Sequence, residues 1–172
     1  MRRLCGELVS GLEGQSWSAP RDLFGALCAA MGRRRERPVH LRTTAFPPGT
    51  ASGLFLALPD RDLVVVEEHT PPDHQVVILG HELWHMHAGH GGHAAGGAAA
   101  AARPLAGGAD LTTVVRRAAA RTHFAENEEW EAERFGLLLG SACRPLLDGG
   151  PPRGEGPVGR IAASLCYRSL LG

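Results

Sequence analysis

The pattern of apolar positions predicts helices at the start of the chain. Apolar residues recur at every fourth position in two stretches, a spacing that places side chains on one face of a helix. The first stretch is Leu4, Leu8 and Leu12, and the second is Leu23, Leu27 and Met31. A Gly-containing segment separates the two stretches. We therefore expect two N-terminal helices whose apolar faces pack into a core.

The pattern then changes to short β-prone runs. Segments rich in Pro, Gly and Asp separate three such runs, and this favours an antiparallel meander of three short strands. The expected strands are Val39 to Thr44, Gly53 to Leu58 and Leu63 to Glu67. The apolar part of the last run, Leu63 to Val66, is the most β-prone stretch of the whole sequence. As an edge strand it can accept an extended peptide as an added strand, and as an interior strand it cannot.

The next segment is expected to be one helix with clear ends. Thr70-Pro71-Pro72-Asp73 is typical of a helix start, because Thr suits the N-cap, Pro the first helical position and an acid the helix dipole. The apolar run Val76 to Leu79 carries the helix into the interior. Gly80 then allows a neighbouring element to pack closely beside it. Glycines at positions 89, 91 and 92 indicate where the helix ends.

This helix carries the motif H-E-x-x-H as His81, Glu82 and His85. Two histidines at this spacing lie on one face of a helix and can share a zinc ion. Glu82, beside the first histidine, can accept a proton from an attacking water. The motif therefore predicts a metalloprotease with one Zn2+ per chain. A catalytic zinc normally has three protein ligands, so a third must come from elsewhere.

The third ligand has several candidates. The metzincin pattern requires a histidine where this chain has Gly91, so that pattern fails. His87 and His90 follow the motif on a helix end that points them away from the other two histidines, and both stay as alternatives. The acidic segment 125–139 is the better donor. Its apolar stripe is bordered by only two of its glutamates, Glu128 and Glu129.

The other glutamates of this acidic helix receive different interpretations. Glu131 is expected to point toward solvent. Glu126 and Glu133 flank Glu129 by one turn, and pairing between charges four positions apart explains both. Glu133 can in addition accept a hydrogen bond from a metal-bound imidazole and so orient it.

Length and composition indicate a single domain spanning residues 1–172. An Ala/Gly-rich insert occupies residues 93–110, and a helix is expected from Leu111 to Arg121. A Pro/Gly-rich linker at 148–157 precedes a last amphipathic helix through Ile161 and Leu170. The insert can cover the site or have no role.

Charge and cysteine usage narrow the classes of function. The net charge is zero, which gives no reason to expect direct binding to nucleic acid or to a membrane. The basic run Arg33 to Arg37 is interpreted as a solvated turn. No signal segment or membrane span is apparent. The cysteines are dispersed and are expected to be buried thiols in a cytoplasmic protein: Cys5, Cys28, Cys143 and Cys166.

Two stretches together resemble a known family. Gly80-His81-Glu82-Leu83-Trp84-His85, followed by a helix that begins Glu129-Trp130-Glu131-Ala132 and continues to Leu139, is similar to the ImmA/IrrE metallopeptidases. The resemblance covers roughly residues 23–139 and implies that His81, His85 and Glu129 are ligands and that Glu82 is the catalytic acid/base. Gly136 departs from the family pattern, which usually has Ala there, and the Ala/Gly insert is long.

Residues and resemblance together lead to one expected fold and function. The fold is an α+β zincin-like domain with N-terminal helices, a small antiparallel three-stranded sheet, the H-E-x-x-H helix and C-terminal helices. The function is that of a zinc metallo-endopeptidase, and the resemblance implies that its substrate is a helix-turn-helix transcriptional regulator. His123 and Tyr167 are candidates for stabilising the oxyanion. Two alternatives stay open: a regulatory binding protein that does not cleave, and a toxin component of a toxin-antitoxin pair.

Overall fold

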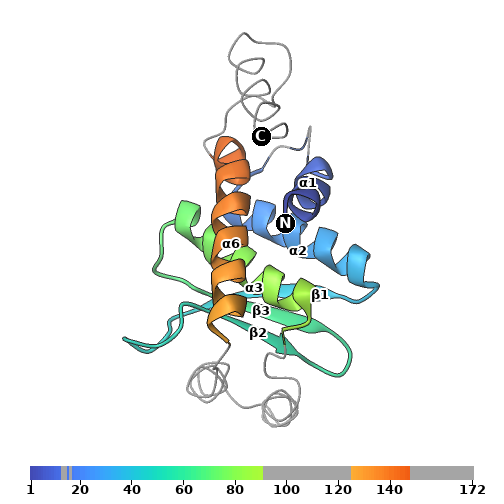
Figure 1. Ribbon diagram of the computed structural model, residues 1–172. Helices are drawn as coiled ribbons and strands as arrows, with labels where there is room; N and C mark the ends of the chain where they lie inside the picture. The colour runs from blue at the N-terminus through green and yellow to red at the C-terminus, as the bar shows by residue number, and fades with distance from the viewer. Residues whose placement is uncertain (13–14, 16, 91–124, 148–172) are drawn as a thin grey trace, which may run out of the picture.

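The computed structural model describes residues 1–12, 15, 17–90 and 125–147. Along this part of the chain two helices are followed by three strands and then by two more helices, which together make a mixed α+β fold (Figure 1). The helices are α1 (Arg2–Ser10), α2 (Pro20–Arg35), α3 (Pro72–Ala88) and α6 (Glu126–Leu147). The strands are β1 (Val39–Thr44), β2 (Gly53–Ala57) and β3 (Asp62–Glu67). Four expected features lie outside the described residues: the Ala/Gly-rich insert at 93–110, the helix at 111–121, the Pro/Gly-rich linker at 148–157 and the last helix.

The three strands form a mixed sheet in the order β1-β3-β2. β3 pairs in parallel with β1 and antiparallel with β2, so the expected antiparallel meander is wrong. The physical reason lies in β3 itself, since residues 62–66 are all buried and such a strand is most stable with a neighbour on each side. The interior-strand interpretation of Leu63 to Val66 is therefore correct, and the edge interpretation is wrong.

The helices gather on one face of this sheet, and α3 forms the middle layer (Figure 1). α3 packs on β2 and β3 with one side and on α6 with the other. Apolar side chains surround it, and Val76, Leu79 and Leu83 are fully buried. The helix begins one residue later than expected, with Pro71 as its N-cap, and ends at Gly89 in the left-handed conformation, as expected. A core shared by the helices and the sheet thus encloses the H-E-x-x-H segment.

Glycines set how closely α3 and α6 approach. A Cβ on Gly80 would lie 2.9 Å from the Cα of Gly136, and a Cβ on Gly136 would lie 2.5 Å from the carbonyl oxygen of Val77. Neither position leaves room for a side chain. The close packing expected at Gly80 is confirmed, and the departure from Ala at Gly136 has a steric cause in this protein.

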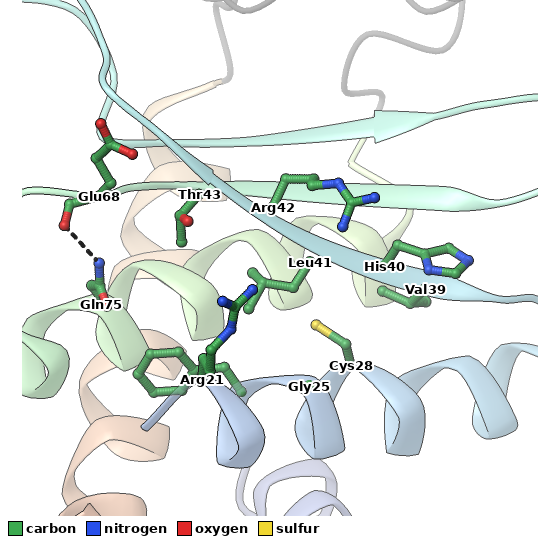
Figure 2. Close-up of a pocket in the computed structure, with 11 residues that line it drawn as sticks. Arg21, Gly25, Cys28, Val39, His40, Leu41, Arg42, Thr43, Glu68 and Gln75 are labelled. Carbon is green, nitrogen blue, oxygen red and sulfur yellow. Dashed lines mark hydrogen bonds between the residues drawn. The ribbon is translucent and has the colours of Figure 1, made fainter. Parts of the chain in front are cut away.

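α2 lies alongside β1, and a groove separates the helix from the outer edge of that strand (Figure 2). Among the described residues, β1 is one edge of the sheet and β2 is the other. The groove is therefore on the side of the sheet away from β2.

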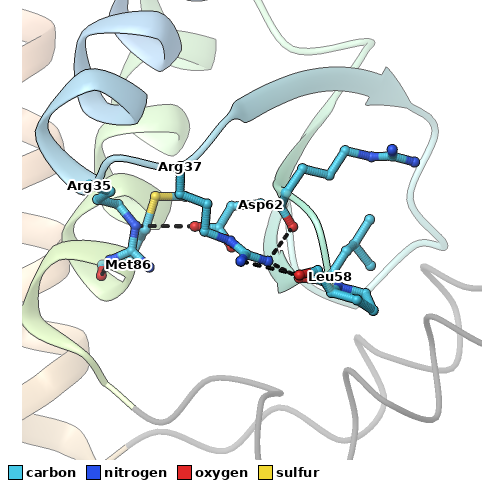
Figure 3. A network of polar contacts seen from close by, with 7 residues as sticks. Arg35, Arg37, Leu58, Asp62 and Met86 are labelled. Carbon is cyan, nitrogen blue, oxygen red and sulfur yellow. Dashed lines mark hydrogen bonds and ion pairs between the residues drawn. The ribbon is translucent and has the colours of Figure 1, made fainter.

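A partly buried ion-pair network joins the end of α2 to the sheet (Figure 3). The Asp62 side chain, 1% exposed, accepts hydrogen bonds from Arg35 Nε at 3.1 Å and from Arg37 Nε at 3.0 Å. Arg35 also donates to the carbonyl of Met86 at the end of α3, and Arg37 donates to the carbonyl of Leu58. The interpretation of this basic run as a solvated turn is therefore wrong for two of its arginines, because a buried acid far along the chain pairs with them.

Two further expectations concern the chain as a whole. Cys5, Cys28 and Cys143 are free and buried, as expected, and Cys166 lies outside the described residues. No helix of the described part of the chain is long and apolar enough to cross a membrane.

Candidate metal centre

α3 places His81 and His85 one turn apart on the same side of the helix. Their Nε2 atoms are 2.9 Å apart, and the two rings meet edge to face. His85 is fully buried, whereas the His81 side chain is 25% exposed. The two imidazoles therefore converge on one point at the border between core and solvent.

α6 brings Glu129 to the same point. Its two carboxylate oxygens lie 3.5 Å from His81 Nε2 and 3.5 Å from His85 Nε2. One ligand atom from each of the three residues lies within 4.8 Å of the others, so this group could hold a metal ion. Close packing at Gly80 and Gly136 makes this possible, because Glu129 lies two turns before Gly136 on the same helix.

Glu128, the other candidate on α6, has a different role. Its carboxylate accepts a hydrogen bond from the N–H of Ala125 at 3.2 Å, at the start of the helix. An acid there satisfies a backbone donor that has no partner within the helix. Of the two glutamates at the apolar border, Glu129 alone belongs to the metal-binding group.

The donor set fits zinc. Two imidazole nitrogens and one carboxylate oxygen are ligands that Zn2+ accepts, and three protein ligands leave a fourth position open for substrate. The same donors suit other divalent transition metals, so the geometry shows that the group could hold a metal ion but does not identify the ion.

Glu82 lies beside this centre with its side chain turned toward β2. Burial, together with the nearby Glu129, raises the pKa of Glu82 to about 8, and a hydrogen bond from the backbone of Phe55 opposes that rise. Gly53 leaves the space that the carboxyl occupies, because a Cβ there would lie 2.6 Å from Glu82 Oε1. The sequence analysis did not predict that Gly53 and Phe55 of β2 contact Glu82. The one signal in the sequence was the glycine at the start of this apolar strand.

The histidines that follow the motif do not join the metal-binding group. His87 packs its ring against Trp84, with centroids 5.5 Å apart. His90 approaches the opposite side of His85, and their Nδ1 atoms are 3.2 Å apart. His90 thus contacts Nδ1 of His85, whereas Nε2 of His85 faces Glu129. A hydrogen-bond partner at Nδ1 fixes the orientation of the imidazole ring.

Two more glutamates of α6 lie near the centre. The pKa of His81 is lowered, because the effect of burial exceeds the opposing effect of the negative charge of Glu133. Glu133 is exposed and lies one turn beyond Glu129. Glu133 therefore acts on His81 through its charge. Glu131 was expected to point toward solvent, but it is half-buried and accepts a hydrogen bond from Trp84 Nε1 at 3.2 Å. That expectation is wrong, because Trp84 on α3 provides a buried donor that the pattern of α6 does not reveal.

His123 and Tyr167, the candidates for the oxyanion, lie outside the described residues. Comparison of the chain with protein-family models, with curated proteins and with solved structures found no match. The site is thus defined by its own residues, which form a three-donor group that could hold a metal ion, beside a buried carboxyl group.

Proposed function

We propose that this protein is a zinc-dependent endopeptidase. The observation that carries the proposal is the convergence of His81, His85 and Glu129, from two helices, beside the buried carboxyl of Glu82. A metal site that served only to stabilise the fold would be expected to have four protein ligands and would not need an adjacent acid. The resemblance to the ImmA/IrrE metallopeptidases supports the same reaction.

A zinc ion held by the three side chains would supply a Lewis acid that polarises the scissile carbonyl and acidifies water. The role of Glu82 is to move the proton. Its carboxylate takes a proton from the attacking water as the new C–O bond forms, and it passes that proton to the amide nitrogen as the C–N bond breaks. In the metal-free protein burial raises the pKa of Glu82 to about 8, so its carboxylate binds a proton more tightly than an exposed glutamate does.

The outer edge of β2 is suited to hold the substrate. The carbonyl of Ser52 and the N–H of Leu58 bond toward β3, so the alternation of the ladder turns the backbone groups of Gly53, Phe55 and Ala57 outward. Glu82 interacts with the backbone of Phe55 on this same edge. An extended substrate segment paired with β2 would therefore pass directly beside the carboxyl group, a role first expected of β3.

We propose further that the substrate is a specific cytoplasmic protein, namely a helix-turn-helix transcriptional regulator. The resemblance to the ImmA/IrrE family is the basis for this identity. A narrow strand-addition site also favours selective cleavage, because the substrate must present one extended segment to a single edge.

Cleavage of a regulator by matched variants tests the proposal. Zinc-loaded protein is incubated with helix-turn-helix regulators, beginning with any encoded beside its gene, and fragments are identified by mass spectrometry. We expect one or a few cuts by the wild type and by Glu126→Gln, which changes an exposed acid at the start of α6. Glu82→Gln should retain zinc and lose turnover by at least about a hundredfold, since it removes the proton acceptor and no ligand.

Two results would contradict the proposal. Turnover by Glu82→Gln at a rate near that of the wild type would contradict the assigned role of Glu82. Tight binding of the regulator without cleavage at any zinc concentration would instead identify a binding protein that retains the metal centre.

A further inference from the structure

The groove between α2 and β1 (Figure 2) lies at the β1 edge of the sheet, whereas Glu82 beside the metal centre faces Gly53 on β2 at the other edge. Its volume is about 580 Å3, which is enough for several side chains of a bound segment. β3 separates β1 from β2, so the groove and the metal centre share no strand.

The floor of the groove is apolar. Phe24 and Cys28 from α2 and Val39 from β1 contribute buried side chains to it, and Leu41 is half-buried beside them. Burial raises the pKa of the Cys28 thiol to about 12, so the thiol that faces the groove in Figure 2 is uncharged. A ligand must therefore present apolar groups to the floor.

The rim of the groove carries two arginines without partners. Arg21 at the start of α2 and Arg42 on β1 are exposed, and neither has a hydrogen bond or ion pair within the part of the chain that the structure describes. Glu68 is the one acid among the described residues that line the groove, and its carboxylate points away from the groove in Figure 2, with Oε1 3.9 Å from His69 Nε2. The rim thus presents positive charge to a ligand.

The wall formed by β1 presents unpaired backbone groups. The carbonyls of Pro38 and Thr44 accept hydrogen bonds from Asp62 and Glu68 on the β3 side. Because backbone groups alternate along a strand, the N–H and C=O of Leu41 and Thr43 point to the outer edge. Among the described residues no strand pairs with this edge.

We propose that this groove binds an extended segment of a partner protein, alternating between acidic and apolar residues, as an additional strand beside β1. Backbone hydrogen bonds to Leu41 and Thr43 hold the segment, and apolar side chains on one of its faces enter the floor. Carboxylates on its other face pair with Arg42, whose side chain lies on the opposite face of β1 from Leu41 (Figure 2). Arg21 at the start of α2 adds positive charge beside the segment. Charge complementarity selects an acidic segment, because neither arginine is paired with another described residue and guanidinium groups bind carboxylates well. The alternation follows from strand geometry, which turns successive side chains to opposite faces.

Peptide binding tests the charge requirement. A fluorescein-labelled peptide of alternating glutamate and valine, long enough to pair with all of β1, is titrated with the full-length protein, and fluorescence anisotropy is recorded at near-physiological salt. We expect saturable binding that weakens by about tenfold or more in Arg21→Glu with Arg42→Glu. Arg144→Glu reverses one charge at an exposed arginine of α6 and should leave the affinity unchanged, whereas Arg42→Glu alone should weaken binding. The matched glutamine and valine peptide should bind at least about tenfold more weakly.

Hydrogen exchange tests the strand pairing. The peptide should protect the amides of Leu41 and Thr43, whereas the amide of Arg42, which points toward β3, should change little. His81→Ala should bind the peptide as the wild type does, so this test is independent of the proposed peptidase activity. No binding, equal loss in Arg144→Glu, exchange at Leu41 and Thr43 that is unaffected by the peptide, or stronger competition by a single-stranded oligonucleotide would each overturn the proposal.

Discussion

The carboxyl group of Glu82 lies where two opposing influences meet. Burial and the neighbouring Glu129 favour its neutral form, whereas the hydrogen bond from the backbone of Phe55 favours its charged form. The first two influences dominate, so the pKa rises from 4.5 to about 8. At the scale of single residues, the sequence was sufficient to predict His81, Glu82 and His85 from the motif and, through the family resemblance, to favour Glu129 over Glu128. It was not sufficient for Phe55, because the backbone N–H of a distant strand leaves no signal in the motif.

The raised pKa predicts how the stability of the metal-free protein depends on pH. Between the unfolded value of 4.5 and the folded value of about 8, the folded state binds the Glu82 proton more tightly than the unfolded state does. The free energy of unfolding should therefore fall as pH rises through this window, by up to roughly 1.4 kcal/mol per pH unit. Glu82→Gln carries no titrating group and should lose this contribution to the slope.

Urea denaturation of chelator-treated protein across this pH window measures the difference. Glu126→Gln, at an exposed acid, should follow the wild-type profile. Parallel profiles for the wild type and Glu82→Gln would contradict the raised pKa.

At the scale of elements, periodicity and turn residues predicted which segments form helices and strands but not which strands pair. Turn residues mark the end of a strand and carry no information about its neighbour. The burial of both faces of β3 places it in the middle of the sheet, and this is a tertiary effect. The approach of α3 to α6 was foreseen only in part, since Gly80 indicated a close contact but did not identify Gly136 as its partner.

Gly136→Ala tests whether the distance between these helices controls the metal centre. The added Cβ would lie 2.5 Å from the carbonyl oxygen of Val77, so α6 must shift away from α3 and carry Glu129 with it. We expect a loss of about 1–3 kcal/mol in the free energy of unfolding. Zinc affinity should fall as well, and both quantities are measured on the same preparation by urea denaturation and by competition with a chromophoric chelator.

Gly6→Ala is the matched control, because a Cβ on Gly6 has no atom within 4 Å. It should leave the zinc affinity unchanged. Wild-type zinc affinity in Gly136→Ala would show that the ligand geometry does not depend on this crossing.

For the whole molecule, the network around Asp62 connects segments that are far apart in sequence. Asp62 is the first residue of β3, and it pairs with Arg35 at the end of α2 and with Arg37 just after that helix. Arg35 also donates a hydrogen bond to the carbonyl of Met86 in the last turn of α3 (Figure 3). The basic run was therefore misinterpreted from the sequence, because its partner is a single buried acid. An acid in a turn before a strand does not reveal whether it will be buried.

Asp62→Ala should leave two arginines without their acceptor inside a partly buried site. We expect the free energy of unfolding to fall by roughly 3 kcal/mol, as measured by urea denaturation. Asp60→Ala removes a neighbouring acid whose ion pair with Arg61 is exposed, and it should cost less than about 1 kcal/mol. Equal losses in the two variants would contradict a structural role for the network.

The central claim is that His81, His85 and Glu129 together hold one catalytic zinc ion, and a zinc titration of the metal-free protein tests it most directly. The wild type and Glu128→Ala should bind one zinc ion per chain with similar affinity. In Glu129→Ala and His85→Ala the zinc affinity should fall by more than roughly 100-fold. Loss of a residue that contacts only a ligand, and not the metal itself, typically lowers the affinity by roughly 10- to 100-fold. Wild-type affinity in Glu129→Ala, or a greater loss in Glu128→Ala, would contradict the assignment of the metal centre.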